Sequence, residues 1–404
     1  MRKWALACAA VQMALTPHLA FAQTAEEVKI GVLTDMSGPD SDMAGSGSVI
    51  AAQMAIEDAG GTVAGRKVVL ISADHQRKAD IANSIAARWF DNEGVDAILD
   101  VPLSSAGLAV QEVARQRNKV VMFSTSATSD LTGKACSPTG FHWTYDTMAV
   151  ANGTAAAVTK AGGKKWFFVT ADYAFGQALQ RDAAAVVEKN GGQVIGGVRH
   201  PVATADFASF LLQAQASKAD VIGLANSATD FTGAVRQSNE FGLQQGGQKV
   251  AGLLAFITDV HSLGLAVAKG TQLTESFYWD LNDETREWSK RFGARHNGRM
   301  PTMIQAGIYS ATRHYLKAIA AANSKDGLTV AKKMKEIPVK DFMTDNAPIW
   351  PSGWVHRDFY LFEVKAPADS KGPWDYYKFI AKIPADDAKP AGSDDACPLM
   401  KKAG

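Results

Sequence analysis

A run of small hydroxyl side chains is the feature of this sequence best suited to chemistry. Residues 122–133 read MFSTSATSDLTG, and six of the nine residues from Ser124 to Thr132 carry a hydroxyl. The run follows NKVVMFS, which has the apolar pattern of a buried strand. Such residues cap helices and form turns, and they can also hold a small polar ligand through hydroxyls and backbone N–H groups. The rest of the sequence has to decide between these interpretations.

Motifs for catalysis are missing from the chain. No G-x-S-x-G, H-E-x-x-H or C-x-x-C occurs, and GSGSVI lies too far from its strand for a dinucleotide fingerprint. His75 could act as a base, but no Ser–His–acid set accompanies it, so a loop or ligand contact is the better interpretation. Asp35, Asp74 and Asp172 end apolar runs, where helix capping explains them more simply than a metal does. We therefore expect no enzyme, no cofactor and no metal.

Length and charge narrow the class of protein. The chain has 404 residues, of which 47% are hydrophobic and 21% charged, a globular composition that suits two domains. Lys and Arg number 42 against 41 Asp and Glu. Because nucleic-acid binders carry a strong basic excess, we expect no nucleic-acid partner.

Residues 1–22 are typical of a secretory signal peptide. A basic start at Arg2 and Lys3 precedes an apolar stretch and the A-x-A end at 20–22, which predicts cleavage before Gln23. The stretch is interrupted by polar residues and is too short to span a bilayer. Its removal leaves 40 basic against 41 acidic residues. We expect an exported protein in the periplasm.

Two cysteines remain after cleavage, Cys136 and Cys397. In an oxidising compartment such a pair usually forms a disulfide. The bridge would tie the C-terminal tail, 389–404, to a loop early in the chain. Two free thiols are the alternative.

Short apolar runs alternate with amphipathic helical patterns along most of the chain. VKIGVLTD, RKVVLISAD, VDAILDV and KVVMFST are each followed by a helical pattern or a polar loop, as in parallel strands covered on both faces. The pattern restarts after HWTYD with KKWFFVTAD, QVIGGVRH, ADVIGLAN and KVAGLLAF. Two doubly wound α/β lobes are therefore predicted, joined by a hinge that the chain crosses more than once. The expected limits are 27–145 with 280–350 for lobe 1, and 146–279 with 351–388 for lobe 2.

The helical segment after residue 280 should pack back on the first sheet, and two aromatic-rich strands, RDFYLFEVK and WDYYKFIAKI, should pair antiparallel. The run 278–280 could line the cleft or mark a crossing between the lobes.

Ligands of open α/β sheets bind beyond the carboxyl ends of the strands. Lobe 1 offers hydroxyls and helix N-termini there, which suit a carboxylate, while lobe 2 offers aromatic faces and amides, which suit an apolar or planar body. The combination predicts a small amphiphilic acid. The candidate ligand contacts are Ser37, His75, Gln76, Ser104, Ser105, Ser126, Ala127, Thr128, Tyr173, Phe175, Asn226, Ser227, Phe256 and Asp259.

The whole mature chain resembles the type I periplasmic substrate-binding proteins of ABC transporters, in the branched-chain amino-acid branch. KIGVLTDMSGP, ADHQRKADIANSIAARWF, TADYAFGQAL, TSDLTG and FYWDLNDETREWSKRF carry the likeness. HWTYDTMAVANGT and LFEVKAPADSKGPWDYYKFIAKIP are similar to the subgroup that takes up aromatic acids such as hydroxycinnamates. The resemblance implies a membrane permease as partner, and we expect a monomer.

The resemblance also implies roles for individual residues. Ser104 or Ser105 would hold the ligand carboxylate together with Ala127 and Thr128, and Phe175 would supply the aromatic contact of lobe 2. The tyrosine of the next lobe 2 loop is replaced by ANSAT, and Asp259 is the candidate partner for a ligand ammonium. These departures favour an aromatic acid over an aliphatic amino acid. A secreted hydrolase and a periplasmic sensor domain are the other hypotheses.

Overall fold

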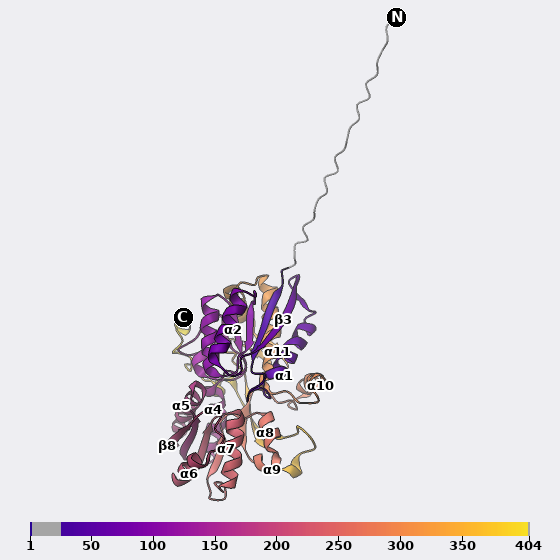
Figure 1. Cartoon of the computed structure of the whole chain (residues 1–404). Helices are drawn as coiled ribbons and strands as arrows, with labels where there is room; N and C mark the ends of the chain where they lie inside the picture. Colours follow the sequence, from indigo (N-terminus) through magenta and orange to yellow (C-terminus); the bar gives the residue numbers. More distant parts are fainter. Residues whose placement is uncertain (2–25, 403–404) are drawn as a thin grey trace.

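The computed structural model describes Met1 and residues 26–402, so the signal peptide predicted at 1–22 lies outside the described residues. Two lobes are visible in Figure 1, with the early strands and helices in one and α4 to α9 in the other. Among the described residues, no helix has the length and apolar character needed to cross a membrane.

Lobe 1 is built on a six-stranded sheet in the order β2-β3-β1-β4-β5-β6, parallel except for the edge strand β2. Every residue of β4 and β5 is buried, as expected for parallel strands with both faces covered. The strands are β1 (Val28–Thr34), β2 (Thr62–Val63), β3 (Arg66–Asp74), β4 (Ala97–Asp100), β5 (Val120–Phe123) and β6 (Gly140–His142).

Lobe 2 contains a four-stranded parallel sheet, β10-β9-β7-β8, and an antiparallel sheet, β11-β14-β15. The predicted aromatic pair is β14 with β15, whose residues Phe379 and Ile380 are exposed. The strands are β7 (Lys165–Ala171), β8 (Gln193–His200), β9 (Val221–Ala225), β10 (Lys249–Gly252), β11 (Gln272–Glu275), β14 (Phe359–Val364) and β15 (Tyr377–Ile383).

Helices follow most of the parallel strands and complete the doubly wound α/β architecture that the sequence predicts. They are α1 (Gly45–Asp58), α2 (Ala79–Asp91), α3 (Ser104–Gln116), α4 (Thr147–Lys160), α5 (Ala174–Lys189), α6 (Ala208–Ala216), α7 (Ala228–Glu240), α8 (Ile257–Leu263), α9 (Leu265–Ala268), α10 (Asp283–Arg295), α11 (Met303–Ala322), α12 (Gly327–Glu336) and α13 (Ala385–Ala388). A hairpin of β12 (Val339–Asp341) and β13 (Thr344–Ala347) follows α12.

The chain returns from lobe 2 to pack α10 and α11 against α1, as the sequence predicts (Figure 1). Polar contacts hold this returning segment against the first part of lobe 1. Thr302 Oγ1 donates to the carbonyl of Met43 (2.7 Å), and Arg291 pairs with Asp58 (2.6 Å). Lobe 1 is therefore assembled from two distant parts of the sequence.

The predicted lobe limits near 145, 280 and 350 fall in the connections between these sheets, and the precise boundaries remain a prediction. At the crossing near 280, Tyr278 Oη and Trp279 Nε1 both donate to the carbonyl of Trp374, at 3.2 and 2.8 Å. These two aromatic side chains therefore anchor the crossing to the loop before β15.

The predicted disulfide joins Cys136 and Cys397, which are 261 residues apart in the sequence. Cys136 follows the hydroxyl segment, and Cys397 is buried in the C-terminal tail. The bridge thus holds the tail on lobe 1, where the C-terminus lies in Figure 1.

Replacing Cys397→Ser should lower the free energy of unfolding by roughly 2–5 kcal/mol, because the unfolded chain regains the entropy of an open loop. Thermal unfolding without reductant measures this. Cys136→Ser is the matched control and should cost the same, with the double variant no less stable than either single one. Two free thiols in an intact-mass measurement of the native protein would contradict the bridge.

Candidate functional site

Asp74, the last residue of β3, joins the loops that follow β1 and β3. Its carboxylate accepts hydrogen bonds from Ser37 Oγ (2.6 Å) and from the backbone N–H of Gln76 (2.7 Å). Ser37 and Gln76, both predicted ligand contacts, are exposed. The hydroxyl of Ser37 is used to build the loop pair, so its geometry gives no support to ligand contact.

His75 lies beside them but is fully buried, and neither ring nitrogen has a hydrogen-bond partner. Burial lowers the pKa of this imidazole, against the nearby carboxylates of Asp35 and Asp74. The ring is therefore neutral at pH 7. A buried polar ring without a partner is available to a polar group that enters the site.

Some hydroxyls of the cluster donate hydrogen bonds within lobe 1. Thr125 donates to the carboxyl of Asp100, and Ser126 Oγ donates to the carbonyl of Val101 (2.5 Å). The carbonyl of Ser126 contacts His142 Nε2 at 2.7 Å. The single hydroxyl hydrogen of Ser126 is thus used to brace the loop, and this predicted contact has no donor left for a ligand.

The hydroxyls of Ser104 and Thr128, unlike that of Ser126, act as hydrogen-bond acceptors. Ser104 Oγ accepts from the N–H groups of Ala127 (3.2 Å) and Thr128 (3.1 Å), and Thr128 Oγ1 accepts from Asp130 N (3.4 Å). Neither hydroxyl donates a hydrogen bond among the described residues, although both are buried. Each therefore keeps one O–H to offer.

The start of α3 adds backbone donors. The helix begins at Ser104, and its N-cap residue Leu103 supplies no side-chain cap. Unpaired N–H groups at a helix start carry partial positive charge. Together with two free hydroxyl hydrogens they can bind a carboxylate, and the half-buried Ser105 lies in the same turn.

Lobe 2 contributes aromatic rings at its own strand ends. Tyr173 and Phe175, at the start of α5, have ring centroids 5.7 Å apart. Phe256, the N-cap residue of α8, is buried and meets Tyr145 of lobe 1 edge to face at 6.0 Å. Asp259 Oδ2 accepts from Phe256 N (2.9 Å). The two lobes are therefore in contact through rings that the sequence places far apart.

The amide of Asn226 is buried, with Nδ2 3.2 Å from His200 Nε2 and Oδ1 without a partner. Ser227, next along the chain, is buried beside Tyr173, whose pKa it helps to lower against the dominant effect of burial. The structure thus brings the lobe 2 candidates together at one end of its parallel sheet.

Arg77 is a candidate site residue that the sequence analysis did not name. Its side chain is 9% exposed, and Nε lies 3.1 Å from Oδ2 of Asp40, which is 3% exposed. The guanidinium carbon lies 5.9 Å from the centroid of the Tyr173 ring in lobe 2. The segment HQRKAD held the signal, because an arginine two residues after a strand-end histidine can enter the same loop.

Asp40, the partner of Arg77, is one of several buried acids whose pKa values are raised. Burial raises the pKa of Asp40 to about 6, an effect that Arg77 opposes, and that of Asp100 to about 6. In lobe 2, burial raises the pKa of Asp259 to about 7 and that of Glu275 to about 8. Tyr377 Oη donates to Glu275 at 2.9 Å. The guanidinium of Arg77 therefore lies near buried carboxyls whose pKa values are raised toward neutral pH.

Several non-glycine residues with positive φ lie in the same loops. Arg77, Leu103 and Ala228 have φ values of 55°, 71° and 52°, and Asp100 has 81°. Positive φ is costly for residues with a side chain and persists where the surroundings enforce it, often at ligand sites. The strain lies at the strand ends of both lobes, where the candidate contacts are.

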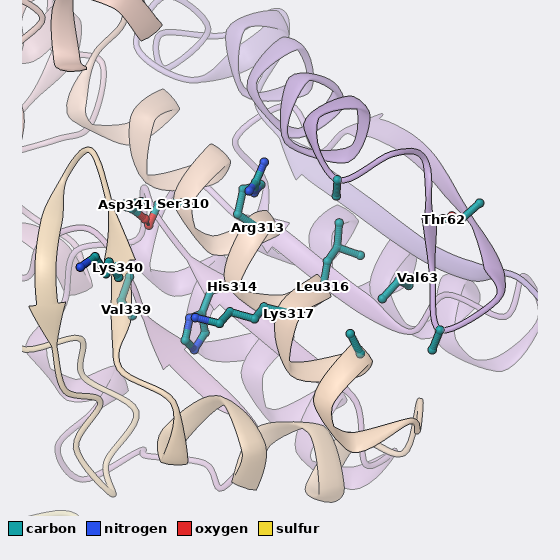
Figure 2. Close-up of a pocket in the computed structure, with 13 residues that line it drawn as sticks. Thr62, Val63, Ser310, Arg313, His314, Leu316, Lys317, Val339, Lys340 and Asp341 are labelled. Atoms are coloured by element: carbon teal, nitrogen blue, oxygen red, sulfur yellow. Dashed lines mark hydrogen bonds between the residues drawn. The ribbon is translucent and has the colours of Figure 1, made fainter. Parts of the chain in front are cut away.

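A separate pocket of about 470 Å³ lies on lobe 1, away from these strand ends (Figure 2). Arg313, His314 and Lys317 of α11 line it, with Thr62 of β2 and Lys340 of β12. None of the predicted contacts lines it. Among the described residues, no group of three His, Cys, Asp or Glu side chains could hold a metal ion.

Residues 27–373 match the family model described as periplasmic binding protein. The chain belongs to this family. It is 45% identical to a periplasmic binding protein of Burkholderia mallei, covering 92% of this chain and 99% of that one, with a TM-score of 0.90. It is 40% identical to a branched-chain amino acid ABC transporter periplasmic ligand-binding protein of Burkholderia xenovorans, covering 93% and 100%, with a TM-score of 0.83.

More distant relatives are also similar to this chain, and two solved structures share its fold. The Leu/Ile/Val-binding protein homolog 6 of Brucella melitensis is 24% identical over 382 residues, which is 91% of this chain and 94% of the relative. Structures of a 4-hydroxybenzoate complex from R. palustris (22% identity, TM-score 0.81) and of a leucine-binding protein from Thermotoga maritima (21%, 0.76) cover 91% and 89% of this chain and 99% of each neighbour.

The buried acids predict a pH dependence of stability. Glu275 has its pKa raised from 4.5 to about 8, so the folded chain binds this proton more tightly than the unfolded chain does. The contribution of Glu275 to stability should therefore fall as the pH rises between about 4.5 and 8, by up to about 1.4 kcal/mol per pH unit.

Glu275→Gln should make the decrease of unfolding free energy between pH 6 and 8 shallower, as measured by denaturant unfolding at several pH values. Glu287→Gln, at an exposed position on α10, is the control and should leave the slope unchanged. An identical slope in Glu275→Gln and the wild type would show that Glu275 is ionised at neutral pH.

Proposed function

We propose that this periplasmic binding protein captures a small carboxylate between its lobes and delivers it to the permease of an ABC transporter. The free hydroxyl hydrogens of Ser104 and Thr128 carry this proposal, because they lie at an uncapped helix start in a lobe boundary rich in aromatic rings. The ligand carboxylate would accept from these hydroxyls and from the α3 backbone. No step of catalysis is needed, and we expect the protein to act as an exported monomer.

Arg77 extends the same site. A guanidinium that keeps its charge in a buried place attracts an anion, and Asp40 balances it when no ligand is present. The ligand body would lie among Tyr145, Tyr173 and Phe256. His75, Asn226 and Ser227 supply polar contacts for substituents of that body, beside Ser105, Ala127 and Phe175.

Closure follows from contacts that need both lobes. The ring of Tyr173 meets Arg77, and Phe256 meets Tyr145, across the boundary. A ligand that contacts both sides stabilises the closed arrangement of a hinged protein more than the open one. Because the ligand binds the closed state more tightly than the open one, it increases the population of closed protein. The permease can then distinguish loaded from empty protein by this closed conformation.

An aromatic acid is the ligand we propose first, because rings line the site from both lobes. An aliphatic amino acid is the second candidate, favoured by one observation. Asp259 and Glu275 are buried carboxyls beside the lobe 2 contacts, and a ligand ammonium would compensate their charge. The two ligands have opposite effects on these acids.

Calorimetry of the mature protein with 4-hydroxybenzoate and with leucine distinguishes the two candidate ligands. Titrations in buffers of different ionisation enthalpy also give the number of protons taken up or released on binding. An aromatic anion should raise the pKa values of nearby carboxyls and be bound with proton uptake, whereas an ammonium should lower them and release protons. If neither these ligands nor a library of small acids binds, the proposed function is wrong.

Thr128→Val should weaken binding of the carboxylate ligand by roughly 1–3 kcal/mol. A buried oxygen of the ligand carboxylate loses its hydrogen-bond donor, while the valine side chain keeps the shape of threonine. The dissociation constant from calorimetry measures this. Thr62→Val, the same change in the separate pocket of lobe 1, should leave the affinity unaltered. Equal affinities for both variants would remove Thr128 from the site.

A further inference from the structure

Lys389 of the C-terminal tail is buried at the junction of the two lobes, where its ammonium group contacts three oxygen atoms. Nζ lies 2.5 Å from Asp146 Oδ2, 2.7 Å from Asp394 Oδ1 and 2.9 Å from Thr132 Oγ1. It also lies 4.4 Å from the centroid of the Trp354 ring. A lysine ammonium has three donors, so this one is fully satisfied inside the protein.

These partners come from different parts of the fold. Asp146 follows the first crossing between the lobes and caps α4 by accepting from Ala149 N (2.8 Å). Trp354 forms a parallel bridge with His142 of β6, at the edge of the lobe 1 sheet, and Ser352 nearby in the chain donates to Asp394 Oδ2 (2.6 Å). Lys389 therefore ties the start of α4 and the segment beside β6 to one tail.

The third partner, Thr132, ends the hydroxyl segment that contains Thr128. That segment is bound to the start of α4, because Thr147 N donates to the carbonyl of Ala127 (2.8 Å) and Ser129 N donates to Thr147 Oγ1 (3.1 Å). Lys389 thus holds both sides of this contact, Thr132 on the hydroxyl segment and Asp146 on α4.

The charges explain why the arrangement is specific. Burial alone lowers the pKa of Lys389, but Asp146 and Asp394 together raise it above its usual value, so the ammonium stays charged. Two carboxylates and one ammonium out of water require close and directed contacts, since each loses its hydration. An apolar side chain of the same size could fill the space without fixing these segments relative to one another.

We propose that Lys389 is a positioning residue for ligand binding, which holds the carboxylate-binding segment around Thr128 against the hinge at Asp146. This inference rests on the proposed function of the site. The tail, secured by Cys136–Cys397, is then part of the binding machinery, although it touches no ligand.

Hydrogen exchange of the ligand-free protein tests the inference without a ligand. Asp394→Asn keeps the pair of Lys389 with Asp146 and is the variant expected to fold, while Lys389→Met removes the whole contact. Both should raise amide exchange in residues 126–133 and 145–150 by about tenfold or more, and leave α2 and α6 unchanged. Lys382→Met is the matched control, an exposed lysine whose pair with Asp358 (2.6 Å) lies outside this network.

Binding of 4-hydroxybenzoate is the second measurement. Asp394→Asn should bind it about tenfold more weakly than the wild type and Lys382→Met, and Lys389→Arg should bind it better than Lys389→Met. Unchanged exchange at 126–133, or an equal rise across both lobes, would overturn the positioning role. A wild type that binds no acid would count against the proposed function, while the exchange result still decides whether the tail orders the segment.

Discussion

Burial of charge where the two lobes meet is the constraint on which the rest of this structure depends. Arg77 and Asp40 are almost completely removed from water, and Lys389 lies wholly inside with two carboxylates. Desolvation makes an isolated buried charge very costly, so each must have partners in defined positions. Because those partners come from separate segments, their pairing dictates how the segments lie.

Several neutral hydroxyls of the 124–132 cluster also have defined hydrogen-bond partners. Some hydroxyls are consumed by the fold, such as Ser126 on the Val101 carbonyl, and others accept backbone N–H groups and keep their own hydrogen, such as Ser104. A binding site for an anion needs the second kind. The first kind holds the loop in its strained backbone conformation, so both are required.

Much of the molecule could be predicted from the sequence. Apolar runs of four to six residues between helical patterns indicate parallel strands, and the parallel sheets of lobe 1 and lobe 2 follow from them. The pairing of Cys136 with Cys397 follows from the count of cysteines in an oxidising compartment. The sequence also predicted that His75, Ser104, Thr128 and Phe256 follow the carboxyl ends of parallel strands, as they do in the structure; their contact with a ligand stays a prediction.

What the sequence could not determine is which atoms remain free. Hydrogen-bond patterns separate Ser126 from Ser104, and they depend on the positions of Val101 and Ala127 in space. Arg77 reaches Asp40 and Tyr173 with the help of positive φ angles in the loop after β3, and Lys389 lies beside Asp146 in a tail that a disulfide holds on lobe 1. Local patterns of polarity thus determined the elements, the lobes and the export prediction. Tertiary structure alone decided the charge pairs and free donors, because these depend on contacts between residues far apart in the chain.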